Sequence, residues 1–132
     1  MRRKFSEYGV DQNVQFTGFV DRRELQQQYA RASVLICPSI WAEQFGLVGP
    51  EALASGVPCV GSAVGGIPEW LKHNEWGYLV PPRDVEQLSG AVYALLSDRN
   101  LRRKFGADGK AFVEKVHSPA EYKRQCLNLL KS

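Results

Sequence analysis

The sequence predicts an α/β domain with a mostly parallel sheet of about four strands and flanking helices. Two patterns support this fold class. Short β-rich runs alternate with helix-patterned segments along the whole chain, as they do in successive strand–helix units. The strand candidates are continuous apolar runs without strict alternation, which is typical of strands that helices cover on both faces.

Strands are expected where Val, Ile, Tyr and Phe gather. The four runs are 14–18 (VQFTG), 33–39 (SVLICPS), 57–62 (VPCVGS) and 77–80 (GYLV). No internal repeat or linker divides them, so we expect a single domain over residues 1–132.

Helix starts are marked by a capping oxygen three residues ahead of Glu or Gln. This pattern occurs at 21–24, 84–87 and 118–121. After Asp21, the apolar side chains of Leu25, Tyr29 and Ala32 recur at helical spacing. The segment 84–130 predicts two or three amphipathic helices.

Composition limits the classes of function. The chain is 44% hydrophobic and 23% charged, as in an ordinary globular domain. Its apolar runs are far shorter than the ~20 residues of a membrane span, so membrane contact is expected to be peripheral at most. The formal net charge of +3 is mild and gives no reason to expect a nucleic-acid partner; basic runs suit solvated helix faces, or an anionic ligand or membrane surface.

Cysteine usage predicts a reducing compartment. Cys37, Cys59 and Cys126 show no Cys-x-x-Cys spacing, and the first two lie in strand-like apolar runs. We therefore expect reduced core thiols in a cytoplasmic protein.

The segment 43–51 (EQFGLVGPE) follows the second predicted strand. We expect a short helix after it, with Gly49 as N-cap, Pro50 in the first turn and Gly56 at the end. A loop that leaves the carboxyl end of a strand and enters a helix lies where open α/β sheets bind ligands. Its backbone N–H groups and the helix dipole favour an anion such as phosphate.

The two carboxylates of this segment suit hydroxyl groups better than phosphate. Glu43 and Glu51 can each accept O–H hydrogen bonds from a vicinal diol, so a ligand with sugar hydroxyls on both sides of a diphosphate fits. Alternatively, Glu51 complements the helix dipole and Glu43 is a solvated loop residue. A second glycine cluster, 61–70 (GSAVGGIPEW), predicts either another wall of the same cleft or turn structure alone.

Several motifs in order resemble one enzyme family. They are GFV, LICPS, E-x-FG-L-V-x-x-E-ALASG-x-P-x-V-x-S-x-VGG-x-PE and GYLVPPRD. From about Val14 to Leu130, the chain resembles the C-terminal, donor-binding domain of retaining glycosyltransferases of the family 4 type, which have the GT-B fold. The resemblance implies a Rossmann-like sheet and a nucleotide-sugar donor such as a UDP- or GDP-hexose. It implies no cofactor and no obligatory metal.

The resemblance also implies roles for residues. Glu51 holds the donor ribose hydroxyls, and Glu43, the candidate catalytic residue, contacts the transferred sugar. The remaining donor-binding contacts fall on Phe19 and Val20 near the nucleotide base and on the backbone amides of Phe45, Gly46, Leu47 and Val48 at the diphosphate or sugar.

Parts of the family's pattern have no counterpart in this sequence. A family member has an N-terminal acceptor-binding domain and two further strand–helix units, whose Arg/Lys pair grips the diphosphate. We therefore expect half of a GT-B C-terminal domain that binds donor without full catalysis. The alternative is a standalone nucleotide-sugar-binding or regulatory module.

The absent strands affect the expected sheet. In the family's strand order they would lie between 14–18 and 33–39, leaving unpaired strand edges. Either these two segments pair directly in a rearranged sheet, or another chain fills the gap. We expect reorganisation or self-association.

Neither histidine predicts a metal site. His73 follows Glu69 by four residues, and His117 precedes Glu121 by four. Each pair offers too few ligands for a metal ion and is expected to be a surface ion pair.

Overall fold

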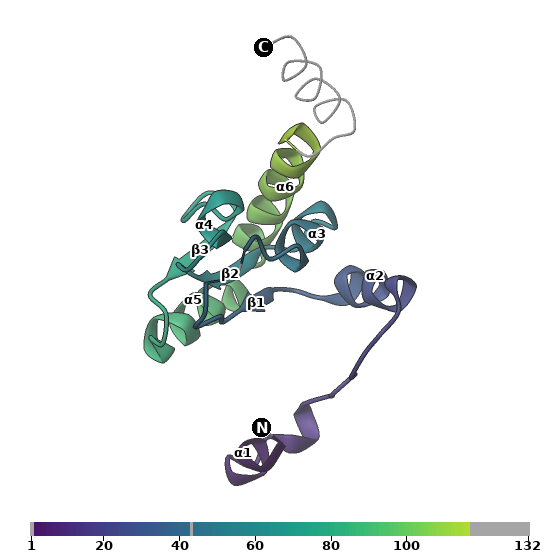
Figure 1. Ribbon diagram of the computed structural model, residues 1–132, viewed down its shortest axis with the longest axis vertical. Coiled ribbons are helices and arrows are strands. Elements are labelled where there is room, and N and C mark those ends of the chain that lie inside the picture. The colour runs from purple at the N-terminus through teal and green to yellow at the C-terminus, as the bar shows by residue number, and fades with distance from the viewer. Residues whose placement is uncertain (1, 43, 117–132) are drawn as a thin grey trace.

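A computed structural model of the chain describes residues 2–42 and 44–116. Its centre is a parallel sheet of three strands in the order β1-β2-β3 (Figure 1). The strands are β1 (Leu35–Cys37), β2 (Cys59–Ser62) and β3 (Gly77–Val80). The helices are α1 (Arg2–Glu7), the 3-10 helix η1 (Asp11–Asn13), α2 (Arg22–Arg31), α3 (Val48–Ala54), α4 (Ile67–Trp70), α5 (Val85–Ser97) and α6 (Arg99–Val116). The α/β class and the parallel sheet are confirmed.

Hydrophobic clusters cover both faces of the sheet. Alternate residues of β2 point to opposite faces, because side chains alternate along a strand. Cys59 belongs to the cluster beneath α3 and α4, and Val60 belongs to the cluster beneath α5. Continuous apolar strands therefore occur because helices cover both faces, as the sequence predicts.

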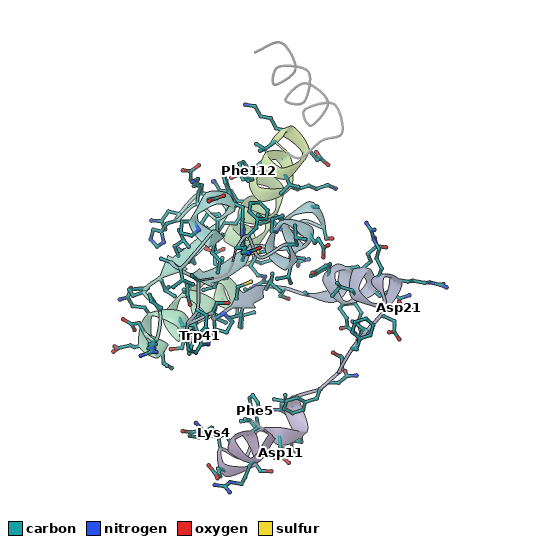
Figure 2. The ribbon with its side chains drawn as sticks, in the orientation of Figure 1. Lys4, Phe5, Asp11, Asp21, Trp41 and Phe112 are labelled. Carbon is teal, nitrogen blue, oxygen red and sulfur yellow. The ribbon has the colours of Figure 1, made fainter. Side chains whose placement is uncertain are left out.

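Helix α6 contacts both clusters. Near its start, Phe105 packs in the α5 cluster, and further along Phe112 packs in the α3 cluster with its ring stacked on Trp76 at 4.4 Å (Figure 2). Between them, α6 lies so close to the end of α3 that a Cβ at Gly106 would overlap the Gly56 carbonyl oxygen. The long helix therefore ties the two halves of the core together.

Two predicted helix caps are present. At the start of α2, Asp21, which is labelled in Figure 2, accepts a hydrogen bond from the Glu24 N–H at 2.8 Å. Asp84 accepts from the Gln87 N–H at 2.9 Å at the start of α5. The third predicted cap, at 118–121, lies outside the described residues.

The first predicted strand is wrong. Residues 14–18 form no strand and lead from η1 to α2, away from the sheet (Figure 1). Phe16 packs instead on Phe5 of α1, with ring centroids 5.7 Å apart. A strand needs a neighbour to hydrogen-bond with, and within the described residues β1 pairs only with β2. The two segments do not pair directly, so the rearranged sheet is also not observed.

The start of α3 differs from the prediction, whereas its end does not. The helix begins at Val48, so Gly49 is its second residue and not its N-cap. Glycine is needed at this position for space, because a Cβ would overlap the Trp70 ring. At the other end, Gly56 has φ +78° and its N–H donates to Leu53, which ends the helix as predicted.

The remaining expectations concern cysteines and membranes. Cys37 and Cys59 are buried thiols in β1 and β2, as predicted, and Cys126 lies outside the described residues. Across residues 2–42 and 44–116, no helix combines the length and the apolar character that crossing a membrane requires.

Two helical glycines, one at the contact between α6 and the end of α3 and one in open space, should respond oppositely to substitution by alanine. Gly106→Ala should lower the free energy of unfolding by about 1–3 kcal/mol, because the added methyl overlaps the Gly56 carbonyl. Gly90→Ala in α5 is the matched control: no atom lies within 4 Å of the added Cβ, so we expect a gain of about 0.5–1 kcal/mol. Urea unfolding measures both, and equal effects of the two variants would contradict the packing described.

Candidate functional site

Trp70 forms a hydrogen bond to the loop that follows β1. The Trp70 indole Nε1–H donates to the Phe45 carbonyl oxygen at 2.6 Å, and Trp70 is buried in α4. In a trans peptide the carbonyl and the next N–H point in opposite directions, so the Gly46 N–H is directed away from the core. The loop around Gly66 lies against it, since a Cβ at Gly66 would overlap the Gln44 carbonyl oxygen. The second glycine cluster is therefore adjacent to the first loop.

The backbone of this loop is shaped for a close approach. Gly46 has φ +72°, a left-handed conformation that favours glycine, and its carbonyl accepts from the Gly49 N–H at 3.0 Å. The N–H groups of Gly46, Leu47 and Val48 donate to no acceptor within residues 2–42 and 44–116. Leu47 and Val48 are exposed. The loop thus presents unused donors at the start of α3.

Glu51 lies in the first turn of α3 and is held by a tyrosine from α2. The Tyr29 hydroxyl lies within hydrogen-bond distance of Glu51 Oε2 and of the Val48 carbonyl oxygen, both at 3.3 Å, and the two acceptors share its single proton. Tyr29 is only 5% exposed, whereas Glu51 is exposed. Burial, with the Glu51 carboxylate as the second cause, raises the pKa of Tyr29 to about 12. The hydroxyl therefore keeps its proton at neutral pH.

Two hollows lie between α2 and α3 and share Leu25 and Tyr29, and we call the two together the groove. The first has a volume of about 410 Å³ and is lined by Arg22, Leu25, Gln26, Tyr29, Glu51, Ala54 and Ser55. The second has a volume of about 480 Å³ and is lined by Thr17, Val20, Leu25, Gln28, Tyr29, Arg31, Ala32, Leu35 and Val48. The structure thus brings Val20, Val48 and Glu51 together around Tyr29.

The other predicted site residues are placed differently. Phe19 is fully exposed and lines neither hollow. Phe45 is half-buried and contributes its carbonyl to Trp70. Glu43 lies outside the described residues.

The predicted ion pair of His73 with Glu69 is wrong. Among the described residues, ion pairs join Arg3 to Glu7 and Lys104 to Asp108. His73 Nδ1 instead accepts the Leu79 N–H at 3.1 Å. The second predicted pair, His117 with Glu121, lies outside the described residues.

Three residues of the site were not predicted from the sequence: Tyr29, Trp70 and Arg22. Helical spacing assigned Tyr29 to the inner side of α2, but it carried no signal that its hydroxyl meets Glu51. Trp70 follows the second glycine cluster, and nothing in its spacing indicated a bond to the Phe45 carbonyl. The chain also places Arg22, at the start of α2, in the wall that holds Glu51.

Comparison with known proteins assigns the family. Residues 1–112 match the family described as glycosyl transferases group 1. The chain belongs to this family. A GDP-mannose-dependent alpha-(1-6)-phosphatidylinositol monomannoside mannosyltransferase of Mycobacterium tuberculosis is 36% identical over 119 residues, which are 86% of this chain and 31% of that protein.

Solved structures share the fold. Sucrose-phosphate synthase from Thermosynechococcus elongatus is 34% identical, with a TM-score of 0.85 over 97% of this chain and 33% of its own. Anabaena HepE, solved in complex with UDP-glucose, is 22% identical, with a TM-score of 0.88 over 98% of this chain and 35% of its own. The GT-B relationship is confirmed, and the chain spans about a third of the length of the relatives it matches.

The environment of Tyr29 predicts alkaline instability. Between the ordinary tyrosine pKa of 10 and the folded pKa of about 12, the unfolded chain loses this proton and the folded chain keeps it. The stabilising contribution is complete below pH 10 and is lost as the pH rises through this window, so the free energy of unfolding falls. In Tyr29→Phe this fall should be shallower.

Urea unfolding at a series of pH values below and within the window tests the prediction. Tyr93→Phe is the control, because its ring is 73% exposed. The prediction would be contradicted if the free energy of unfolding of both variants fell with pH as steeply as that of the unaltered chain.

Proposed function

We propose that this chain forms the donor-binding part of a retaining glycosyltransferase. It binds a nucleoside diphosphate hexose, with UDP or GDP as the nucleotide, and the enzyme to which it belongs transfers the hexose to an acceptor. The observation that carries the proposal is the loop at 46–48, whose N–H groups donate to no acceptor among the described residues, beside the exposed Glu51 in a chain of the group 1 family. The GDP-mannose-dependent relative and the UDP-glucose complex of a fold neighbour support this class of donor.

Each part of the site suits one part of such a donor. The N–H groups of Gly46, Leu47 and Val48 suit the diphosphate or the sugar next to it. The Phe45 amide is assigned to the same part of the donor from the sequence motif alone. The Glu51 carboxylate suits the ribose hydroxyls, since a carboxylate accepts two O–H bonds from a diol. Val20 lines the second hollow, where we assign the base. Phe19 lines neither hollow and is assigned to the base from the sequence motif alone. Glu43 is assigned to the transferred sugar from the sequence motif.

The chemistry we propose is stabilisation of the leaving group. As the bond between the anomeric carbon and the diphosphate breaks, negative charge grows on the departing phosphate oxygen. Fixed N–H donors stabilise that charge without needing to reorient, because Trp70 already holds the loop. Neither a metal nor a cofactor is included in this proposal, and the nucleotide sugar is the substrate.

We further propose that the 132-residue chain binds donor without completing transfer. It spans 31% of the length of the mannosyltransferase relative, and the acceptor site and the Arg/Lys pair are assigned to other parts of such an enzyme. The alternative, a standalone binding or regulatory module, uses the same groove. The two differ in whether transfer appears when the acceptor-binding part is supplied. The buried thiols of Cys37 and Cys59 suit a cytoplasmic location.

Donor titration tests the site. Calorimetry with UDP-glucose and GDP-mannose should detect binding of at least one donor, and Glu51→Ala should weaken it roughly 10- to 100-fold through loss of hydrogen bonds to a charged group. Glu86→Ala is the matched control, since Glu86 is also an exposed first-turn glutamate, but of α5 and outside the groove. If neither donor bound, the proposal would be contradicted.

We propose self-association through the outer edge of strand β1. This strand has no neighbour on its outer edge within the described residues, and Ile36 lines an apolar hollow with Val92, Tyr93 and Leu96 of α5. Sedimentation should show mass that rises with protein concentration. Ile36→Lys should shift the chain toward monomer, because a charge on an edge strand opposes pairing. A monomer at every concentration would contradict this proposal.

A further inference from the structure

The contact between Tyr29 and Glu51 has a consequence for ligand binding. Tyr29 lies in the last turns of α2, and its ring packs in the same cluster as Ala52 and Leu53 of α3. Its hydroxyl reaches the Glu51 carboxylate, which is exposed beside the groove, at 3.3 Å. A rigid buried side chain thus contacts the flexible acidic group to which the nucleotide ribose is assigned.

We propose that Tyr29 is a positioning residue of the nucleotide site, which holds the Glu51 carboxylate in the orientation that receives the ribose hydroxyls. This inference rests on the proposed function of the groove.

Preorganisation explains why this contact matters for affinity. A glutamate side chain has several rotatable bonds, and an unrestrained one on a helix surface samples many rotamers. Binding a diol requires one of these orientations, so the ordering of the side chain opposes association. The Tyr29 hydroxyl imposes much of that order before the ligand arrives, because packing fixes the ring.

The geometry leaves the carboxylate able to bind. Tyr29 contacts Oε2, and a carboxylate has about four lone-pair sites, so acceptors remain for two ribose hydroxyls. The Val48 carbonyl competes for the same proton at 3.3 Å, but a charged acceptor forms the stronger bond. The Tyr29 hydroxyl carries its proton at physiological pH, so the hydrogen-bond donor is present.

The hydroxyl also connects the two ends of the proposed site. Through the Val48 carbonyl it touches the residue at which the donor loop enters α3, and through Oε2 it touches Glu51 one turn later. A role limited to joining α2 and α3 would affect all ligands alike. Positioning of Glu51 affects only ligands that carry ribose hydroxyls.

The test compares two ligands that differ only in those hydroxyls. UDP and 2′,3′-dideoxy-UDP are titrated calorimetrically into the full chain and into Tyr29→Phe, Glu51→Gln and the double variant. We expect Tyr29→Phe to weaken UDP roughly three- to tenfold, as for the loss of a single hydrogen bond, and to leave the dideoxy ligand within about twofold. With Glu51→Gln already present, Tyr29→Phe should change the UDP affinity by less than about twofold.

Replacement of Tyr29 by 4-aminophenylalanine provides a rescue, because it retains the ring and an N–H donor at the same place. It should restore part of the UDP affinity, and it supplies the measurement if Tyr29→Phe does not fold. Equal weakening of both ligands, additive effects of Tyr29→Phe and Glu51→Gln, or unchanged UDP affinity would each overturn the inference. If the unaltered chain bound UDP no better than its dideoxy analogue, the ribose assignment itself would be wrong; if it bound neither, the proposed function would fail first.

Discussion

The candidate site depends on how Trp70 packs beneath α3. Its ring occupies the space that a side chain at Gly49 would need, so α3 lies close above α4. Its indole N–H fixes the Phe45 carbonyl at 2.6 Å and thereby the direction of the next N–H group. One buried side chain thus sets both the depth of the helix and the orientation of the loop that enters it. The shape of the loop at 44–47 therefore depends on the core as well as on the sequence of the loop.

The parts of the fold that the sequence predicts well are those decided locally. Apolar runs predict strands β1 to β3, capping carboxylates predict the starts of α2 and α5, and Gly56 predicts the C-terminal end of α3. Each of these signals acts within a few residues. The segment 14–18 has the composition of a strand but forms none, because a strand also requires a neighbour that composition does not reveal. The sequence predicts Gly49 as a cap, but glycine is needed there because the Trp70 ring leaves no room for a side chain. Trp70 lies 21 residues further along the chain, so the local sequence does not reveal this contact.

The same distinction applies to the site. The loop and Glu51 were recognisable because a strand, glycines and a helix start follow one another in the sequence. The bond from Tyr29 joins residues 22 positions apart and depends on how α2 lies against α3. Arg22 likewise lines the first hollow because of how α2 lies against α3. Residues that line a site can be proposed from motifs, whereas residues that hold them in place emerge from packing between elements.

Helix α6 has a consequence for the order of folding. The outer side of α3 is covered only when Gly106, Gly109 and Phe112 pack on it, and these residues are made about fifty positions after α3 itself. During synthesis this side of α3 therefore stays unpacked until α6 has been added. The core around α3 is therefore completed late in synthesis, by the last helix that the structure describes.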